Sequence, residues 1–349
     1  MIKKIELAPD YEITPVLNGL WQLSRGHALD GDLDQQDIQK AFNLLAERGF
    51  TTFDLADIYI GAEDALGKFL RTLEGHSTLT KHDIQIHEKY VPDLDILKTV
   101  SFQDTERIVD RSLQKLGRDY IDLMQFHWWD YEIDRYVDVA YNLVKLQEKG
   151  KIRHIGVTNF DTKHLKKLVD GGIPVISCQS QYSLFDRRPE KQLLEYCMSE
   201  DISHICYGTI AGGFLSEKYL EREQFEPETR SQVKYLQIIE ETLGYEGYQQ
   251  LLVILKEIAD KYQVSIANVA SRYILQQDGV AGVIIGTRSS RHVESNAQIF
   301  EFELTEADLE RIKTFVSQFP MIEGDAYEAE RTPDSVFRSI IRMNEAEGE

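Results

Sequence analysis

Short apolar runs alternate along the chain with longer stretches in which apolar residues recur at helical spacing. The runs are rich in branched and aromatic side chains, which is typical of buried strands. They lie at Val16–Trp21, Thr51–Leu55, Ile84–Glu88, Tyr120–Phe126, His154–Val157, Val175–Gln179, His204–Tyr207 and Gly282–Ile285. Between the first two runs, Ile38, Phe42 and Leu45 form an apolar stripe, which predicts a helix over residues 34–48.

About eight strand–helix units of this kind predict a parallel sheet closed as a (β/α)8 TIM barrel. A doubly wound open sheet is the structural alternative. Such a sheet usually carries Gly-x-Gly-x-x-Gly after its first strand, and the stretch Leu17–Trp21 does not supply this motif. The pattern therefore favours the barrel.

Two segments interrupt the alternation. Residues 208–244 form a long, mostly polar insertion after the seventh strand, on the side where barrel active sites lie. We assign the barrel to residues 1–320 and an acidic C-terminal extension to residues 321–349. Part of this extension is expected to be helical, and its apolar face could cap the barrel or mediate self-association. That face consists of Val336, Phe337, Ile340 and Ile341.

Composition excludes several classes of function. The chain has 349 residues and a formal net charge of −20, which argues against binding to nucleic acid or to an anionic membrane. No apolar run approaches the roughly 20 residues of a membrane span, and no secretory signal is visible. Cys178, Cys197 and Cys206 lack the spacing of a zinc site, and an odd number of thiols suits a reducing compartment. We expect a cytoplasmic protein without a metal.

Four polar residues lie at or near the predicted carboxyl ends of neighbouring strands. Asp54 ends the second strand, Tyr59 follows in the next loop, Lys89 ends the third strand and His127 ends the fourth. In a barrel the carboxyl ends of the strands converge on one mouth. A buried carboxylate needs a partner, and Lys89 is the natural candidate for Asp54.

Around these residues the chain resembles the aldo-keto reductase family. Three segments carry the resemblance, which extends from about Leu7 to Phe319: Phe53–Tyr59 (Phe-Asp-Leu-Ala-Asp-Ile-Tyr), Leu116–Trp128 and Gly150–Phe160. One departure is Ile60, which separates Tyr59 from Gly61. The resemblance implies NAD(P)H-dependent reduction of an aldehyde or ketone, or the reverse oxidation of an alcohol or sugar.

By this resemblance Asp54, Tyr59, Lys89 and His127 form the catalytic tetrad. Tyr59 would donate the proton to the carbonyl oxygen, and His127 would donate a second hydrogen bond to it. The ammonium of Lys89, held by Asp54, would favour the Tyr59 phenolate in the reverse direction. Strand alternation also points His87 and Gln125 inward, either as a polar shell that supports Lys89 and His127 or as residues that fill the barrel.

The resemblance also implies positions for the coenzyme. Thr158, Asn159 and Gln179 would hold the nicotinamide amide, and Tyr207 would stack on its ring. For the adenosine end, the matching positions are Thr287, Arg288, His292 and Asn296. Ser290 is the predicted cap of a helix whose amino end favours phosphate. Many relatives have Lys in place of Gly286 and Arg in place of His292, yet we expect NADP(H) rather than NAD(H).

Trp21 and Trp128 occupy positions that border the substrate in relatives, which suits a small-molecule carbonyl or alcohol. A lid formed by the insertion around Gly212 and Gly213 is a further expectation. Two other classes of function stay open. One is a nucleotide-binding, redox-sensing regulatory subunit with the same barrel. The other is a metal-dependent hydrolase, for which His127 and Asp54 are too few ligands.

Overall fold

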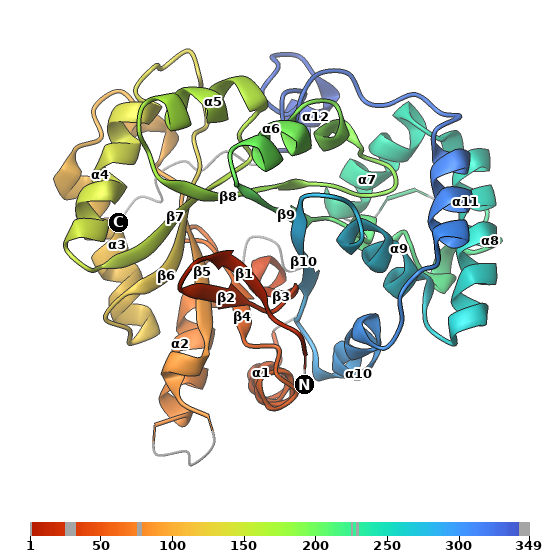
Figure 1. The fold of residues 1–349 in the computed structure, drawn as a ribbon, viewed down its shortest axis with the longest axis horizontal. Helices are drawn as coiled ribbons and strands as arrows, with labels where there is room; N and C mark the ends of the chain where they lie inside the picture. The colour runs from red at the N-terminus through yellow and green to blue at the C-terminus, as the bar shows by residue number, and fades with distance from the viewer. Residues whose placement is uncertain (1, 25–32, 75–78, 225, 228–229, 342–349) are drawn as a thin grey trace.

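Eight parallel strands form a closed barrel in the computed structural model, which describes residues 2–24, 33–74, 79–224, 226–227 and 230–341 (Figure 1). Around the barrel the strands follow the order β10, β3, β4, β5, β6, β7, β8 and β9. Their bounds are β3 Val16–Gly19, β4 Thr52–Asp54, β5 Gln85–Tyr90, β6 Ile121–Phe126, β7 Ile152–Thr158, β8 Val175–Gln181, β9 Ser203–Tyr207 and β10 Val280–Gly286. Each predicted strand overlaps one of these, so the predicted (β/α)8 fold is confirmed.

Helices surround the barrel as an outer layer (Figure 1). The α-helices of the described residues are α1 Gln35–Glu47, α2 Ala62–Thr72, α3 Phe102–Leu116, α4 Tyr136–Glu148, α5 Thr162–Asp170, α6 Leu193–Ser199, α7 Arg230–Glu241, α8 Gly244–Tyr262, α9 Ile266–Leu275, α10 Val293–Ala297, α11 Glu306–Val316 and α12 Val336–Ile340. The 3-10 helices are η1 Trp21–Leu23, η2 Lys81–Asp83, η3 Leu94–Ile96, η4 Arg188–Glu190, η5 Ala211–Gly213, η6 Glu217–Tyr219, η7 Ser290–His292 and η8 Gln298–Phe300. None of the described helices is both long enough and apolar enough to cross a membrane.

Local sequence explains where these elements begin and end. At the start of α3, Ser101 and Asp104 form a reciprocal capping box, and Gly117 ends the helix with a left-handed φ of 66°. Helix α2 packs closely on α3 because Gly67 has no side chain. A Cβ at Gly67 would lie 2.1 Å from the carbonyl oxygen of Lys115. The outer helices are thus fixed against each other by caps and by close backbone contact.

A hairpin that the sequence pattern did not predict lies across the centre of the barrel in Figure 1. It consists of β1 Ile5–Ala8 and β2 Tyr11–Ile13, which pair antiparallel. Tyr11 stacks on His154 with ring centroids 4.9 Å apart, and its hydroxyl lies 2.9 Å from Nε2 of His87. The hairpin therefore closes the amino-terminal end of the barrel, opposite the predicted catalytic mouth.

The C-terminal extension packs on the barrel as far as the structure describes it. Helix α12 contacts α7 of the insertion, and Phe337 is buried. In the middle of the extension, the carboxylate of Glu330 accepts hydrogen bonds of 2.7 and 2.8 Å from the Arg188 guanidinium. Arg188 also binds the carboxylate of Asp186. Phe337 therefore packs inward while Val336 of the same face is 42% exposed, so capping and self-association both stay predictions for this face. Residues 342–349 of the extension lie outside the described residues.

Candidate active site

The carboxylate of Asp54 and the ammonium of Lys89 form a buried ion pair inside the barrel mouth. Asp54 ends β4, and Lys89 lies one residue before the end of β5. The ammonium contacts Oδ1 of Asp54 and donates to the carbonyl of Leu55 at 3.1 Å. Both side chains are less than a tenth exposed. The partner that Asp54 requires is therefore Lys89, as the sequence predicts.

Two amides satisfy the second oxygen of Asp54. The side-chain nitrogens of Gln125 and Gln179 donate to Oδ2 at 2.9 and 2.7 Å. Gln179 also donates to the side-chain oxygen of Gln125 at 2.7 Å. A buried charge is tolerated only when it is paired and its remaining lone pairs are satisfied. Asp54 meets this condition, so its carboxylate fixes the ammonium of Lys89 in place.

Tyr59 lies in the loop before α2, beside this ion pair. The ammonium of Lys89 is 5.4 Å from the centre of the phenol ring. Burial raises the pKa of Tyr59, and the attraction of Lys89 for the phenolate only partly offsets this. The phenol is thus protonated at neutral pH. The effect of Lys89 on this pKa has the direction expected from the sequence, and the role of Tyr59 as proton donor stays a prediction.

His127 lies at the end of β6 and is a neutral imidazole. Its Nδ1 donates to the carbonyl of Thr158 at 3.1 Å. Burial, together with the positive charge of Arg331, lowers the pKa of His127 to about 3. A neutral ring carries one proton, so Nε2 is an acceptor. The expected second hydrogen bond from His127 to a carbonyl oxygen is therefore not available in this tautomer.

The predicted nicotinamide-binding residues lie together at the ends of β7, β8 and β9. Thr158 pairs with Gln179 in the sheet, and the hydroxyl of Tyr207 donates to the side-chain oxygen of Asn159 at 2.8 Å. The hydroxyl oxygen of Thr158 is buried and has no hydrogen-bond partner among the described residues. Because a buried polar atom is costly when unpaired, this hydroxyl fits a polar ligand such as a carboxamide.

Gln125 and His87 both point into the barrel, but they do different things. Gln125 binds Asp54 rather than His127. His87 binds Tyr11 of the closing hairpin rather than Lys89. Of the two readings that the sequence left open, support of the tetrad fits Gln125, and filling of the barrel fits His87.

Trp128 is arranged differently from the expectation, whereas the placement of Trp21 beside the substrate stays a prediction. Trp128 is fully buried, and its indole nitrogen donates to the carbonyls of Asp130 and Ile133 at 2.8 and 3.0 Å. It therefore holds its own loop and does not face the mouth. Its neighbour Trp129 packs edge-to-face on His127, with ring centroids 4.5 Å apart. Trp21 is 44% exposed in η1.

Two residues of the C-terminal extension reach the mouth, and sequence reasoning missed both. The ring of Tyr327 lies 5.9 Å from that of His127. The guanidinium of Arg331 donates to the carbonyls of Asn159 and Trp128, each at 2.7 Å. The family resemblance ends before this segment, so no motif could have identified them.

The segment predicted to bind the adenosine end follows β10. Thr287 is buried and donates through its hydroxyl to the carbonyl of Gly19 at 3.2 Å, whereas Arg288 and His292 are exposed. Asn296 follows His292 by one helical turn on α10. The predicted cap is wrong by one residue, because Ser289 rather than Ser290 caps η7.

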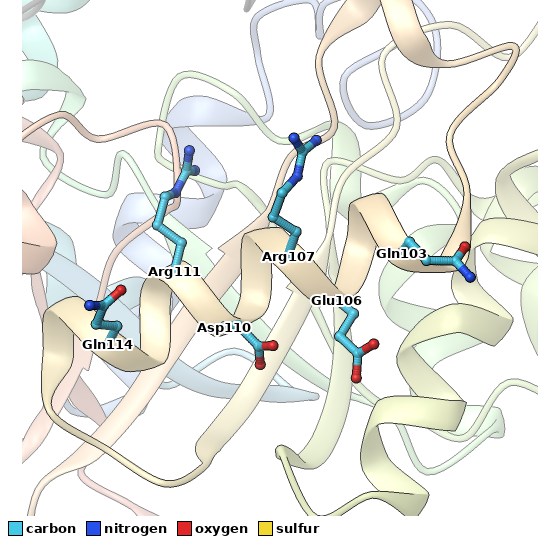
Figure 2. A pocket seen from close by; sticks show the side chains of 6 residues that line it. All are labelled: Gln103, Glu106, Arg107, Asp110, Arg111 and Gln114. Atoms are coloured by element: carbon cyan, nitrogen blue, oxygen red, sulfur yellow. The ribbon is translucent and has the colours of Figure 1, made fainter.

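Two further features lie outside this mouth. Cys178, Cys197 and His204 bring ligand atoms within 4.8 Å of one another between β8, β9 and α6, although their spacing in the sequence gave no sign of it. The hollow in Figure 2 lies on the outer face of α3, and all six of its lining side chains come from that helix. None of them is a predicted site residue.

Comparison with known proteins places this geometry in a family. The sequence model of the Aldo/keto reductase family matches residues 15–317. The NADH-specific methylglyoxal reductase of Escherichia coli (strain K12) is 27% identical over 323 residues, which are 88% of this chain and 96% of that protein. The chloroplastic pyridoxal reductase of Arabidopsis thaliana is also 27% identical, over 97% of this chain and 89% of that protein.

Solved structures give the same fold. The glycerol dehydrogenase of Gluconobacter oxydans superposes with a TM-score of 0.76 at 23% identity, over 92% of this chain and 97% of that one. A thermostable aldo-keto reductase superposes with a TM-score of 0.70 at 22% identity, over 90% of this chain and 99% of that one. The family match covers most of the chain, and the barrel has the arrangement that the family requires. The chain is therefore an oxidoreductase that belongs to the aldo/keto reductase family.

Proposed function

We propose that this chain reduces a small aldehyde or ketone, with Tyr59 as the proton donor, or oxidises the corresponding alcohol. One observation carries the proposal: Asp54, Lys89 and Tyr59 meet at the strand ends. Gln179 of the predicted nicotinamide site joins this group, because its side-chain nitrogen donates to Oδ2 of Asp54 at 2.7 Å. A bound nicotinamide coenzyme would supply the hydride, because no side chain can donate one. The remaining steps belong to the chain's own residues.

Tyr59 holds the proton that the carbonyl oxygen acquires. Its raised pKa keeps the phenol protonated in the reducing direction. As the oxygen gains negative charge, the nearby ammonium of Lys89 stabilises the phenolate that remains. The carboxylate of Asp54 keeps that ammonium charged, since its attraction raises the pKa of Lys89 against the effect of burial. His127, which is neutral and hydrogen-bonded to the carbonyl of Thr158, lines the mouth.

Four residues would hold the nicotinamide. The unpartnered hydroxyl of Thr158 and the amides of Asn159 and Gln179 offer donors and acceptors for a carboxamide. The ring of Tyr207 offers an aromatic face nearby. Asn159 has a left-handed φ of 61°, a strained conformation that is common at ligand sites.

The named relatives differ in the coenzyme for which they are named. One is an NADH-specific methylglyoxal reductase, and another from Schizosaccharomyces pombe is named for NADP. A similar structure from Bombyx mori was solved in complex with NADP. Family membership thus supports a nicotinamide coenzyme, while the preference for NADP(H) predicted from the sequence needs support from this chain's own residues.

Small carbonyl compounds are the substrates that we propose first. Relatives are named for reduction of methylglyoxal, glyoxal and pyridoxal. In this chain Trp129 and Tyr327 bring aromatic edges against His127, and Arg331 lies beside them. Such an aromatic mouth suits a small carbonyl compound.

The test is a panel of methylglyoxal, glyoxal, pyridoxal and nitrobenzaldehyde, each assayed by nicotinamide absorbance with NADH and with NADPH. We expect turnover of at least one aldehyde and its loss in Tyr59→Phe. Tyr245→Phe is the matched control, because that hydroxyl binds the carbonyl of Arg222 on the surface. Coenzyme binding without turnover of any substrate would contradict the proposal and favour a regulatory subunit.

A further inference from the structure

The carboxylate of Asp37 binds hydrogen-bond donors of the segment predicted to bind the adenosine phosphate. Asp37 lies in the first turn of α1, far in sequence from this segment. Its Oδ2 accepts from the hydroxyl of Ser289 at 2.8 Å and from the backbone nitrogen of Ser290 at 3.1 Å. Its Oδ1 accepts from the hydroxyl of Ser290. Three donors at the start of η7 are therefore already bound to an acid of the chain itself.

These donors are the groups that a phosphate at this position would use. Hydroxyls and backbone N–H groups at the start of a helix are typical ligands of phosphate oxygens. The hydrogen bonds from Ser290 and Ser289 lower the pKa of Asp37, so the carboxylate is anionic at neutral pH. A second anion at the same donors would lose their hydrogen bonds and would also meet like-charge repulsion.

The side chains at this position offer little positive charge to offset the negative charges of Asp37 and a phosphate. The family resemblance would place Lys at Gly286, but a Cβ at Gly286 would lie 2.0 Å from the side-chain oxygen of Gln22. Gln22 of η1 thus fills the path of a longer side chain. The family resemblance would place Arg at His292, and partial desolvation together with the positive charge of Arg291 lowers the pKa of this exposed histidine, so its neutral form predominates at pH 7. Arg288 and Arg291 remain, but both side chains are exposed, and Lys40 of α1 already attracts the Asp37 carboxylate.

We infer that Asp37 makes this chain select NAD(H) over NADP(H), which revises the preference predicted from the sequence. A ribose 2′-hydroxyl can donate a hydrogen bond to the carboxylate, as acidic residues do in other dinucleotide sites. A 2′-phosphate has no proton to donate at neutral pH and carries negative charge of its own. Asp37 is thus a specificity-determining residue. The inference rests on the proposed function, because it assumes a nicotinamide coenzyme.

The experiment measures dissociation constants of NADH and NADPH by titration calorimetry with the full chain, independently of turnover. The wild type should bind NADH at least about tenfold more tightly than NADPH. Asp37→Asn keeps the shape and one of the two acceptor oxygens but removes the charge. It should tighten NADPH binding about tenfold and change NADH binding by less than about threefold. Titration with 2′,5′-ADP and with 5′-AMP should reproduce the same difference.

Asp34→Asn is the matched control, because Asp34 lies on the same helix end and its side chain accepts, among the described residues, from the backbone nitrogens of Gln36 and Asp37. Asparagine also caps helices well, so folding should be preserved and the NADH preference unchanged. A wild-type preference for NADPH, or a ratio that Asp37→Asn does not alter, would reduce Asp37 to a structural role and leave the proposed function standing. Failure of the wild type and of every variant to bind either coenzyme would overturn both this inference and the proposed function.

Discussion

The two ends of the proposed coenzyme site use an aspartate in opposite ways. At the catalytic end, Asp54 is buried and pairs with the ammonium of Lys89. At the adenosine end, Asp37 is half-exposed and binds neutral donors from Ser289 and Ser290. The first carboxylate fixes a cation for chemistry, whereas the second keeps its negative charge available to a ligand. The partner, rather than the residue type, decides what a carboxylate does.

The two ends also differ in how visible they are in the sequence. Asp54 belongs to a motif that includes Tyr59, and the strand pattern brings Lys89 beside it. Asp37 is separated from Ser289 by 252 residues and belongs to no motif that the chain displays. The catalytic end therefore follows from local pattern and fold class, while the adenosine end depends on how α1 packs against η7.

The largest expected effect concerns the catalytic end alone. Tyr59→Phe removes the proton donor, so turnover should fall about 10²–10⁴-fold, the range typical of a lost general acid. Affinity for the coenzyme should change by less than about twofold, because the phenol hydroxyl is absent from the adenosine contacts. Steady-state kinetics and coenzyme titration on the same preparation check both. Near-normal turnover would contradict the assignment of Tyr59.

A second comparison concerns stability at the two ends. Lys89→Met leaves the buried carboxylate of Asp54 without its cation and should cost about 3–5 kcal/mol of unfolding free energy. Arg48→Met is the matched change at the adenosine end, where Arg48 pairs with Glu294 and the side chains are 41% and 69% exposed. That surface pair should contribute less than about 1 kcal/mol.

Urea unfolding of both variants at neutral pH measures the two costs. Similar losses in the two variants would mean that Asp54 is solvated or neutral in solution. The contrast between a buried and an exposed carboxylate would then fail.

The smallest expected effect on turnover is that of His87→Leu. His87 contacts Tyr11 at the closed end of the barrel, so carbonyl reduction should change by less than about threefold. Burial lowers the pKa of His87 to about 3, below the roughly 6.5 of an unfolded histidine. The unfolded state therefore binds more protons between these values, and the wild type loses stability as pH falls from about 6.5 toward about 3.

His87→Leu should lose less stability over this range than the wild type, because it removes one group that the unfolded state protonates. Urea midpoints at neutral and acidic pH measure the difference. His82→Leu, on the surface, is the control and should follow the wild type. A large loss of turnover in His87→Leu would mean that the imidazole supports Lys89 after all.

Most of the barrel could be predicted because its strands are buried on both faces and so appear as apolar runs. The hairpin of β1 and β2 could not, since its short strands are stabilised by contacts such as Tyr11 with His154. The positions of Asp54, Lys89 and Tyr59 followed from strand ends. The neutral state of His127 did not follow, because burial sets its pKa. Trp128 and Trp129 are neighbours and both are buried, and only packing decides that Trp129 rather than Trp128 contacts His127.

By itself the sequence determined the alternation of strands and helices, the family motifs and the acid–cation pair that a buried Asp54 requires. These follow from local spacing and from the cost of burying charge. The tertiary structure alone decided that Tyr327 and Arg331 of the extension reach the mouth and that Asp37 takes the donors of Ser289 and Ser290. Such contacts join residues that are distant in the chain, and their geometry is set by how helices pack on a closed sheet.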